Sequence, residues 1–505
     1  MKILVRPAEA GHDVQSAGHY ALPLLMTMLM TACTVGPNYT RPIVQVPETY
    51  RDKAAGNAVS GDPKGSPLHT TSPLHTTSPL QSTASLADVQ WFDVFKDEAL
   101  TRVVNTALQQ NFDLRVAAER VIQAREQFHI TGTERFPTVN GSASVGSSRT
   151  SEIGAVPVPA GANPQVSSIQ AGVSVGWELD VWGRIRRLNE AARAQYLATE
   201  EARRGVVTTL IADVSQTYLS LRTLDAQLEI AKRTRDIAND NLRLTELRQD
   251  RGVATGLDVR QAQQLLYTAT GQIASLEREI TQTENALSLL LGQTPGDVTR
   301  GASLEELQAP PAVPAGLPSS LLERRPDIRQ AEQELVAANA QIGVAKAEYF
   351  PRISLTGFLG VESRGLTDLL TSRAGMWSAD AGLLAPIFNA GRTKANVKLA
   401  ESVQRELVVN YQKAIYGALR EVADALTEYR KRTEQRVEQQ RLVDALRDST
   451  RLSTQRYQGG LDSYLQVLDA ERNLFQGELD LAVLHQQELA SIIDLYRALG
   501  GGWTM

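Results

Sequence analysis

Cysteine is almost absent from this 505-residue chain, which has Cys33 and no other. A lone cysteine excludes a disulfide framework and a cysteine-based metal cluster. Aromatic residues make up 5% of the chain, and the formal net charge of −5 lacks the positive excess that a nucleic-acid-binding face needs. No run of about 20 apolar residues follows the N-terminal region, so the sequence predicts no transmembrane helix. A chain of this kind can cross a bilayer only as a closed β-barrel.

The position of Cys33 indicates lipid attachment. Residues 21–32 form an apolar run of signal-peptide length that ends in small residues immediately before Cys33. The Thr31-Ala32-Cys33 ending resembles a bacterial lipobox, in which the cysteine is lipidated and becomes the mature N-terminus. The alternative is an ordinary cleaved signal that leaves an unused cysteine. We expect 1–32 to be a signal peptide and Cys33 to carry the lipid, because a lone thiol has little other use here.

Residues 33–90 are predicted to form an extended tether behind the lipid. They contain an imperfect hexapeptide repeat, SPLHTT, at 66–83, and a Pro/Ser/Thr segment of this kind cannot bury a core. His69 and His75 belong to the repeat, but no carboxylate or further histidine keeps their spacing. The sequence therefore predicts no metal and no cofactor other than the covalent lipid.

The folded part of the chain is predicted to be one unit built twice. The first copy covers 91–300 and the second 327–505, and a Pro-rich connector at 301–326 joins them. Helical turns at 251–258 and 456–466 occupy matching places in the two copies. Each turn carries glycine, which ends a helix in the left-handed conformation.

Each turn also has a candidate cap for the helix that follows. Thr255 precedes Asp258 by three residues in the first turn, and Ser463 precedes Gln466 by three in the second. This is the spacing of a capping box, in which two side chains satisfy the free amides at a helix start.

Two stretches, 139–180 and 352–388, are predicted strand hairpins because their apolar residues recur with a period of two. In the second stretch, the alternation continues through Ala385 and Ile387. In the first stretch, polar residues and glycine face one side, and apolar residues face the other, namely Ile169, Ala171, Val173, Val175, Trp177 and Leu179. Apolar-outward alternation over about ten residues is typical of a tilted strand in a transmembrane barrel.

Long helices fill most of the remaining chain. One helix is predicted over 97–130, and a second runs almost unbroken over 185–249 with apolar residues at seven-residue spacing. A helix of about 65 residues is roughly 100 Å long, more than a globular domain needs. Each copy thus has a helix, a strand hairpin, a very long helix, a tight turn and a returning helix. Four strands per chain are too few to close a barrel, so we expect a homo-oligomer with cyclic symmetry.

The sequence patterns that could indicate a catalytic site are weak in this chain. Residues 172–176 match G-x-S-x-G, but the match lies inside a predicted strand and no helix follows, as a hydrolase nucleophile elbow requires. His129 and His485 lie on predicted helices, where we interpret them as surface or packing residues. We therefore expect no enzymatic activity.

Arg184, Arg186 and Arg187 follow a predicted strand end. They suit either contact with lipid headgroups at a barrel rim or the solvated start of a helix, and both interpretations stay open.

Leu465 and Asp469 are the candidate functional residues of the second turn. They are four residues apart on a predicted helix and therefore share one face. Copies arranged around an axis would present a ring of leucines and a ring of carboxylates, which is how pores restrict passage. The alternative, in which Leu465 packs between helices and Asp469 is solvated, stays open at this point.

Together these features resemble the outer membrane factor family, the TolC/OprM-like channels, in its lipoprotein (NodT-type) branch. The residues that carry the resemblance are CTVGPNY at 33–39, ERRPDI at 323–328, YLQVLDAERNLF at 464–475 and YRALGGGW at 496–503, with the two turns. The likeness spans Cys33 to Trp503, whereas the SPLHTT repeat departs from the family.

The resemblance implies a homotrimer with a strand barrel in the outer membrane, in contact with its lipid, and a helical tunnel across the periplasm. It implies docking to a periplasmic adaptor (membrane fusion) protein and an inner-membrane pump of the RND type. It also maps the constriction of the closed tip onto Leu465 and Asp469. Relatives with two aspartates here have the first where this chain has Gln466. Asp258, the equivalent of Gln466 in the first copy, is expected to supply the missing charge.

The expected function is a passive, gated outer-membrane exit duct of a tripartite efflux system, exporting small molecules or drugs. A type I protein-secretion duct would use the same fold. A periplasm-spanning structural coiled-coil lipoprotein without a lumen is an alternative of another class, against which the outward apolar strands argue. A wide duct has no need to recognise its cargo, so the sequence carries no substrate signature.

Overall fold

The structure is a computed structural model that describes residues 34–47, 50, 86, 97–155, 158–159, 161–307 and 318–501. Cys33 and the 66–83 repeat therefore lie outside the described residues. The chain divides into two compact units, and each unit draws residues from both halves of the sequence. Unit 1 holds Gln123–Leu197 and Gln333–Val409 with the described residues before position 43, and unit 2 holds the rest.

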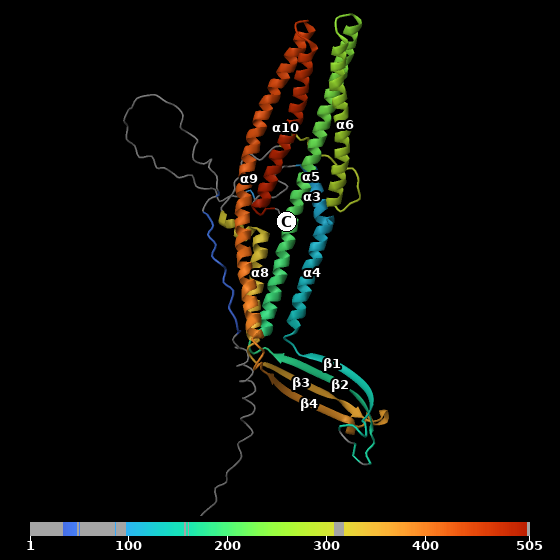
Figure 1. Cartoon of the computed structure of the whole chain (residues 1–505), viewed down its shortest axis with the longest axis vertical. Helices are drawn as coiled ribbons and strands as arrows, with labels where there is room; N and C mark the ends of the chain where they lie inside the picture. The colour runs from blue at the N-terminus through green and yellow to red at the C-terminus, as the bar shows by residue number, and fades with distance from the viewer. Residues whose placement is uncertain are drawn as a thin grey trace, which may run out of the picture. The chain divides into compact units, whose positions relative to one another are not determined.

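A four-stranded antiparallel sheet forms much of unit 1 (Figure 1). Its strands are β1 (Thr138–Arg149), β2 (Gln165–Leu179), β3 (Arg352–Ser363) and β4 (Gly375–Leu384), in the spatial order β1-β2-β3-β4. The central pairing joins the two halves of the chain, because β2 pairs with β3 in a register that places Gly172 opposite Gly360.

One face of this sheet is apolar, and no other described element of the chain covers it. Val173, Val175 and Trp177 alternate along β2 and are all exposed, and Trp377 on β4 is 76% exposed. A water-soluble sheet buries such residues, and exposed apolar patches mark surfaces that contact something else. The predicted apolar-outward alternation of β2 agrees with this exposure pattern.

The alternation predicted through Ala385 and Ile387 is wrong as a strand, because β4 ends at Leu384. Pro386 follows two residues later, and proline has no N–H to donate to a strand ladder.

The helix predicted over 97–130 is also interrupted. It divides into α3 (Glu98–Gln110) and α4 (Phe112–Thr133) at Asn111, whose backbone angles, φ −56° and ψ 134°, are not helical. The Asn111 side chain accepts a hydrogen bond from Leu114 N at 2.9 Å, and its amide donates to Leu290 O at 2.9 Å. Asn111 is therefore a cap that starts a second helix within an unbroken apolar pattern.

Two helical hairpins lie mostly in unit 2, and the long helix of each begins in unit 1 (Figure 1). The first joins α5 (Arg184–Asp250) to α6 (Gly256–Leu290), and the second joins α9 (Arg392–Gln458) to α10 (Tyr464–Ala498). α5 and α9 have 67 residues each, and α6 and α10 have 35 each. The two turns lie at the same end of unit 2 in Figure 1.

Shorter elements connect these parts. α7 (Leu321–Arg324) follows the 3₁₀ turn Pro318–Ser320 and leads into α8 (Pro326–Ala347), which has 22 residues, as does α4. Two further 3₁₀ turns, Leu366–Asp368 and Ser372–Ala374, lie between β3 and β4.

The core of unit 2 is formed by the apolar stripes of its helices. Val214 and Leu221 on α5, Leu287 on α6, and Val104 and Ala107 on α3 are completely buried in one cluster. The seven-residue spacing of Val214 and Leu221 places both on one face of α5, which explains their shared burial. None of the described helices is both long enough and apolar enough to span a membrane.

Candidate gate at the two helical hairpins

The first turn is closed by a complete capping box. α5 ends with Gly252 at φ 74°, and Val253 N donates to Arg248 O at 2.8 Å, the bond that closes a Schellman motif. Asp258 then accepts from Thr255 N at 2.7 Å and from Thr255 Oγ1 at 2.9 Å, while Asp258 N donates to Thr255 Oγ1 at 3.3 Å. The predicted Thr255–Asp258 box is confirmed, and the Asp258 carboxylate is engaged in it.

The second turn has the same backbone path but different side-chain bonds. Gly460 has φ 73°, and Leu461 N donates to Arg456 O at 2.9 Å. Ser463 occupies the N-cap position of α10, but its side chain makes no capping hydrogen bond, so the predicted capping box with Gln466 is wrong. Instead, Arg456 forms an ion pair with Asp462 across the turn. The hydrogen bonds from Arg456 lower the pKa of the half-buried Asp462 carboxyl.

An apolar cluster lies directly behind the two turns. Tyr464, Val467 and Leu468 of α10 are buried against Ala262 and Leu265 of α6. These α10 positions define the face that the second hairpin turns toward the first. The start of α10 is therefore fixed in rotation, and its opposite face is left uncovered by unit 2.

Leu465 and Asp469 lie on the uncovered face. Leu465 is 51% exposed, and Asp469 is exposed with one hydrogen bond, accepted from Asn473 Nδ2 at 3.3 Å. Gln466 is exposed as well. In the alternative interpretation, a solvated Asp469 agrees with this exposure, whereas Leu465 is not packed between helices within this chain. No hydrogen bond or ion pair joins Asp258 to Asp469 in the described part of the chain, and Asp258 bonds within its own turn.

Contacts between the two hairpins form a set of residues that the sequence did not single out. The guanidinium of Arg248 on α5 lies 4.6 Å from the centre of the Tyr457 ring on α9, and Tyr457 packs edge-on against Tyr464 at 5.3 Å. Further along, Asn241 Nδ2 on α5 donates to Glu471 Oε1 on α10 at 2.6 Å. The Arg248–Tyr457 and Asn241–Glu471 contacts join residues more than 200 positions apart, which a local sequence pattern cannot reveal. The one available signal was an acidic residue, Glu471, on the apolar face of a helix.

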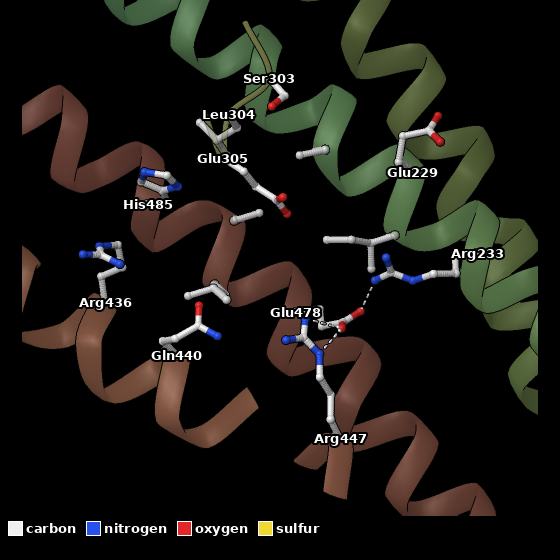
Figure 2. Close-up of a pocket in the computed structure, with 14 residues that line it drawn as sticks. Glu229, Arg233, Ser303, Leu304, Glu305, Arg436, Gln440, Arg447, Glu478 and His485 are labelled. Carbon is white, nitrogen blue, oxygen red and sulfur yellow. Dashed lines mark hydrogen bonds and ion pairs between the residues drawn. The ribbon is translucent and has the colours of Figure 1, made fainter. Parts of the chain in front are cut away.

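A cavity of about 620 Å³ lies among α5, α9, α10 and residues 303–305, further from the turns (Figure 2). Figure 2 shows Glu478 of α10 between Arg233 of α5 and Arg447 of α9, and both arginines form ion pairs with it. His485 lines the same cavity, and burial together with the positive charge of Arg436 lowers its pKa. No group of histidine, cysteine and carboxylate side chains suited to a metal ion occurs in the residues that the structure describes.

The arginine cluster after β2 is bound to protein groups. Arg184 pairs with Glu178 at 2.9 Å, and Arg186 pairs with Asp180 at 3.2 Å. Arg187 is buried and cannot act at a lipid or solvent surface, so both interpretations are wrong for this residue.

Arg187 instead holds the segment that begins at position 34. It donates to Val35 O at 3.3 Å, to Gly36 O at 3.2 Å and to Asn38 Oδ1 at 2.7 Å. Asn339 of α8 donates to Pro37 O at 3.0 Å from the other side.

Ser174, the serine of the G-x-S-x-G match, lies in the middle of β2. Its hydroxyl lies 3.4 Å from Asn140 O on β1, and the strand continues to Leu179. The strand-to-helix elbow of a hydrolase is therefore not formed at this serine.

Comparison with known proteins gives a family for this arrangement. A family model described as outer membrane efflux protein matches residues 103–293 and 317–501, more than half of the chain. The chain is 39% identical over 486 residues to the solvent efflux pump outer membrane protein SrpC of Pseudomonas putida, covering 96% of this chain and 98% of SrpC. It is 37% identical over 423 residues to the probable outer membrane lipoprotein SilC of Salmonella typhimurium, covering 83% of this chain and 89% of SilC.

Solved structures give the same result. The chain is similar to the open state of the MtrE outer membrane channel of Neisseria gonorrhoeae, with a TM-score of 0.79 and 30% identity. That match covers 93% of this chain and 99% of MtrE. The chain belongs to the outer membrane efflux protein family.

Proposed function

We propose that this protein is the outer-membrane exit duct of a tripartite efflux system, a passive gated channel that exports small molecules. The observation that carries the proposal is the combination of an apolar, uncovered sheet face with helical hairpins that leave Leu465 and Asp469 uncovered. Membership of the outer membrane efflux protein family and the likeness to the open MtrE channel support it. SrpC is named for solvent efflux and CusC of Escherichia coli for cation efflux, and both names support the export of small molecules or ions.

The assembly that fits this function is a homotrimer. Each protomer contributes its four strands to a shared transmembrane barrel, and the α5–α6 and α9–α10 hairpins to a helical barrel continuous with it. The exposed side chains on β2 and β4 then face outer-membrane lipid. Internal duplication is supported by the equal lengths of α5 and α9, at 67 residues, and of α6 and α10, at 35.

Anchoring and partners follow from the same proposal. Cys33 carries the lipid, and the name of SilC as a lipoprotein supports this. A periplasmic adaptor and an inner-membrane RND pump supply the cargo and the energy, since the duct itself performs no chemistry and holds no cofactor.

The constriction is formed by Leu465 and Asp469 from three protomers. Rings of leucine and carboxylate restrict passage by dewetting and by charge. Asp258 plays a secondary role, because its carboxylate is already bonded to Thr255.

The experiment is single-channel conductance of the purified full-length protein in planar bilayers. We expect low conductance that rises roughly twofold or more in Leu465→Ala and in Asp469→Ala, because each change removes one ring of the constriction. Asp480→Ala is the matched control. Asp480 is also exposed on α10, on nearly the same helical face, and lies about 16 Å further from the turn.

The outcomes separate the possibilities. Conductance that rises equally in Asp480→Ala contradicts a constriction at the turn. Absence of conductance in wild type and all variants contradicts the channel and favours a structural coiled-coil lipoprotein.

A further inference from the structure

Glu471 is a buried carboxyl group whose hydrogen bonding is incomplete. It lies on α10, two residues after Asp469, and is 7% exposed. Its Oε1 accepts the hydrogen bond from Asn241 of α5, while its Oε2 is buried without a partner. An ionised carboxylate in such a place loses its hydration and regains one hydrogen bond.

No positive charge compensates Glu471. Among the described residues, no ion pair includes it, whereas the next buried glutamate on the same face, Glu478, is paired with Arg233 and Arg447. Arg248 on α5 is half-buried, and its guanidinium lies over the Tyr457 ring. Other charged side chains on the neighbouring turns are exposed, namely Asp240, Arg243 and Glu246 on α5, Arg260 on α6, Asp448 and Arg451 on α9, and Asp469 and Arg472 on α10. The carboxylate of Asp258 on α6 is bonded to Thr255.

Burial governs the pKa of Glu471 and of Tyr464. Burial raises the pKa of Glu471 to about 7, and the hydrogen bond from Asn241 opposes this rise only in part. Burial likewise raises the pKa of Tyr464 above its usual range, and the charge of Glu471 adds to the rise. Tyr464 therefore stays a neutral phenol and adds no negative charge beside Glu471.

We propose that Glu471 is a protonation-sensitive positioning residue that controls how tightly the second helical hairpin packs against the first near the turns. With a neutral carboxyl, the Asn241–Glu471 contact lies within an uncharged interface, and α10 packs firmly on α5. With an ionised carboxyl, the interface contains an uncompensated charge, and the start of α10 loosens. The link from this packing to the Leu465 and Asp469 constriction rests on the proposed function, whereas the packing change itself does not.

The direction of the pH effect follows from the proton balance. The packed state holds the Glu471 proton up to about pH 7, whereas an open state with a solvated carboxyl releases it near 4.5. The packed state therefore binds more protons between these values, and its stability falls as pH rises through this window. The loss is complete once the pH exceeds the pKa in the packed state, so neutral and alkaline conditions favour the loosened hairpin.

The test is amide hydrogen exchange of the full-length, detergent-solubilised protein, followed in peptides covering 464–475 and corrected for intrinsic exchange rates. We expect the opening equilibrium of this segment to rise about tenfold between about pH 6 and about pH 8. A peptide covering 280–290 of α6, whose Leu287 packs against α3 and α5 in a separate cluster, serves as the internal reference and should not show this rise.

Three variants make the test specific. Glu471→Gln keeps the acceptor for Asn241 and cannot ionise, so its protection should be independent of pH and equal to that of wild type in acid. Glu478→Gln is the matched control: it breaks two ion pairs, so it should weaken protection at both pH values and retain the tenfold ratio. Asn241→Asp places a second carboxyl beside Glu471 and should move the transition to higher pH.

The proposal is overturned if wild type shows no pH-dependent loosening, or if Glu471→Gln keeps the tenfold change. Conductance is measured separately over the same pH range. If exchange responds to pH but conductance does not, the packing switch stands and its link to the gate is contradicted. A protein that responds in exchange but never conducts contradicts the proposed function and leaves the switch intact.

Discussion

At the scale of single residues, the two hairpin turns satisfy the start of their returning helices by different means. Thr255 and Asp258 bond each other's backbone amides in the first turn. In the second turn Ser463 makes no capping bond, and Arg456 pairs with Asp462 instead. The turn that carries the proposed constriction is thus closed by a surface ion pair between an exposed Arg456 and a half-buried Asp462. Such a pair contributes less than a cap and is screened by salt.

This difference predicts unequal costs for two matched substitutions. Thr255→Ala removes a capping oxygen and should destabilise the start of α6 by about 1 kcal/mol. Hydrogen exchange over 256–262 should then be about fivefold faster. Ser463→Ala removes a hydroxyl that caps nothing and should change exchange over 464–470 little. Exchange of both segments in the two variants checks this, and equal effects contradict the assignment of the caps.

The same residues mark what the sequence could reveal about the site. The Thr255–Asp258 box was predictable because it depends on neighbours three positions apart. The absence of a capping bond at Ser463 was not predictable, because the second turn is closed by the ion pair between Arg456 and Asp462 instead. The shared face of Leu465 and Asp469 followed from helical spacing. The exposure of that face and the Asn241–Glu471 contact depend on how distant helices pack.

At the scale of elements, the β2–β3 pairing depends on glycine. Gly172 lies opposite Gly360, and the Phe358 ring covers both. A methyl group added at Gly172 would lie 2.7 Å from Leu359 O and would also collide with the Phe358 ring. The first glycine of the G-x-S-x-G match is therefore explained by close approach of two strands.

Gly172→Ala should accordingly weaken the sheet, by about 1–3 kcal/mol for an overpacked site. Gly146→Ala on β1 is the matched control, because its added methyl group would have Ser168 Oγ as nearest neighbour at 3.8 Å. Urea unfolding of the purified protein in detergent measures both variants. A midpoint lowered equally in the two, or unchanged in Gly172→Ala, contradicts the close approach.

Elements were predictable where the pattern is long and regular. Apolar residues at every second position predicted the alternation of β2, and apolar residues at every seventh position predicted the buried stripe of α5. The break at Asn111 was hidden, because the apolar spacing continues across it and the bond to Leu290 O comes from another part of the chain. The end of β4 was hidden in the same way, since apolar residues continue past Leu384 while the hydrogen bonding stops.

At the scale of the whole molecule, the start of the described chain is tied to unit 1. Arg187 and Asn339 bond the backbone of Val35, Gly36 and Pro37. Gly36 has φ 100° and lies so close to Gly343 of α8 that neither position has room for a side chain. The residues that follow the proposed lipid anchor thus belong to the folded structure.

Lipidation of Cys33 is the prediction that this arrangement makes most useful to test. Cys33→Ser should abolish incorporation of a fatty-acid probe and remove the corresponding mass from the intact protein, because the thiol is the one acyl acceptor of this type in the chain. Thr34→Ser is the matched control next to it and should retain the label. Probe retained in Cys33→Ser contradicts the anchor. Label lost in both variants points to failed export, so the control separates a missing acceptor from a protein that never reaches the lipidating enzyme.

The bonds from Arg187 do not involve Cys33, so we expect the unlabelled Cys33→Ser protein to keep segment 35–38 in place and to give the wild-type exchange pattern there.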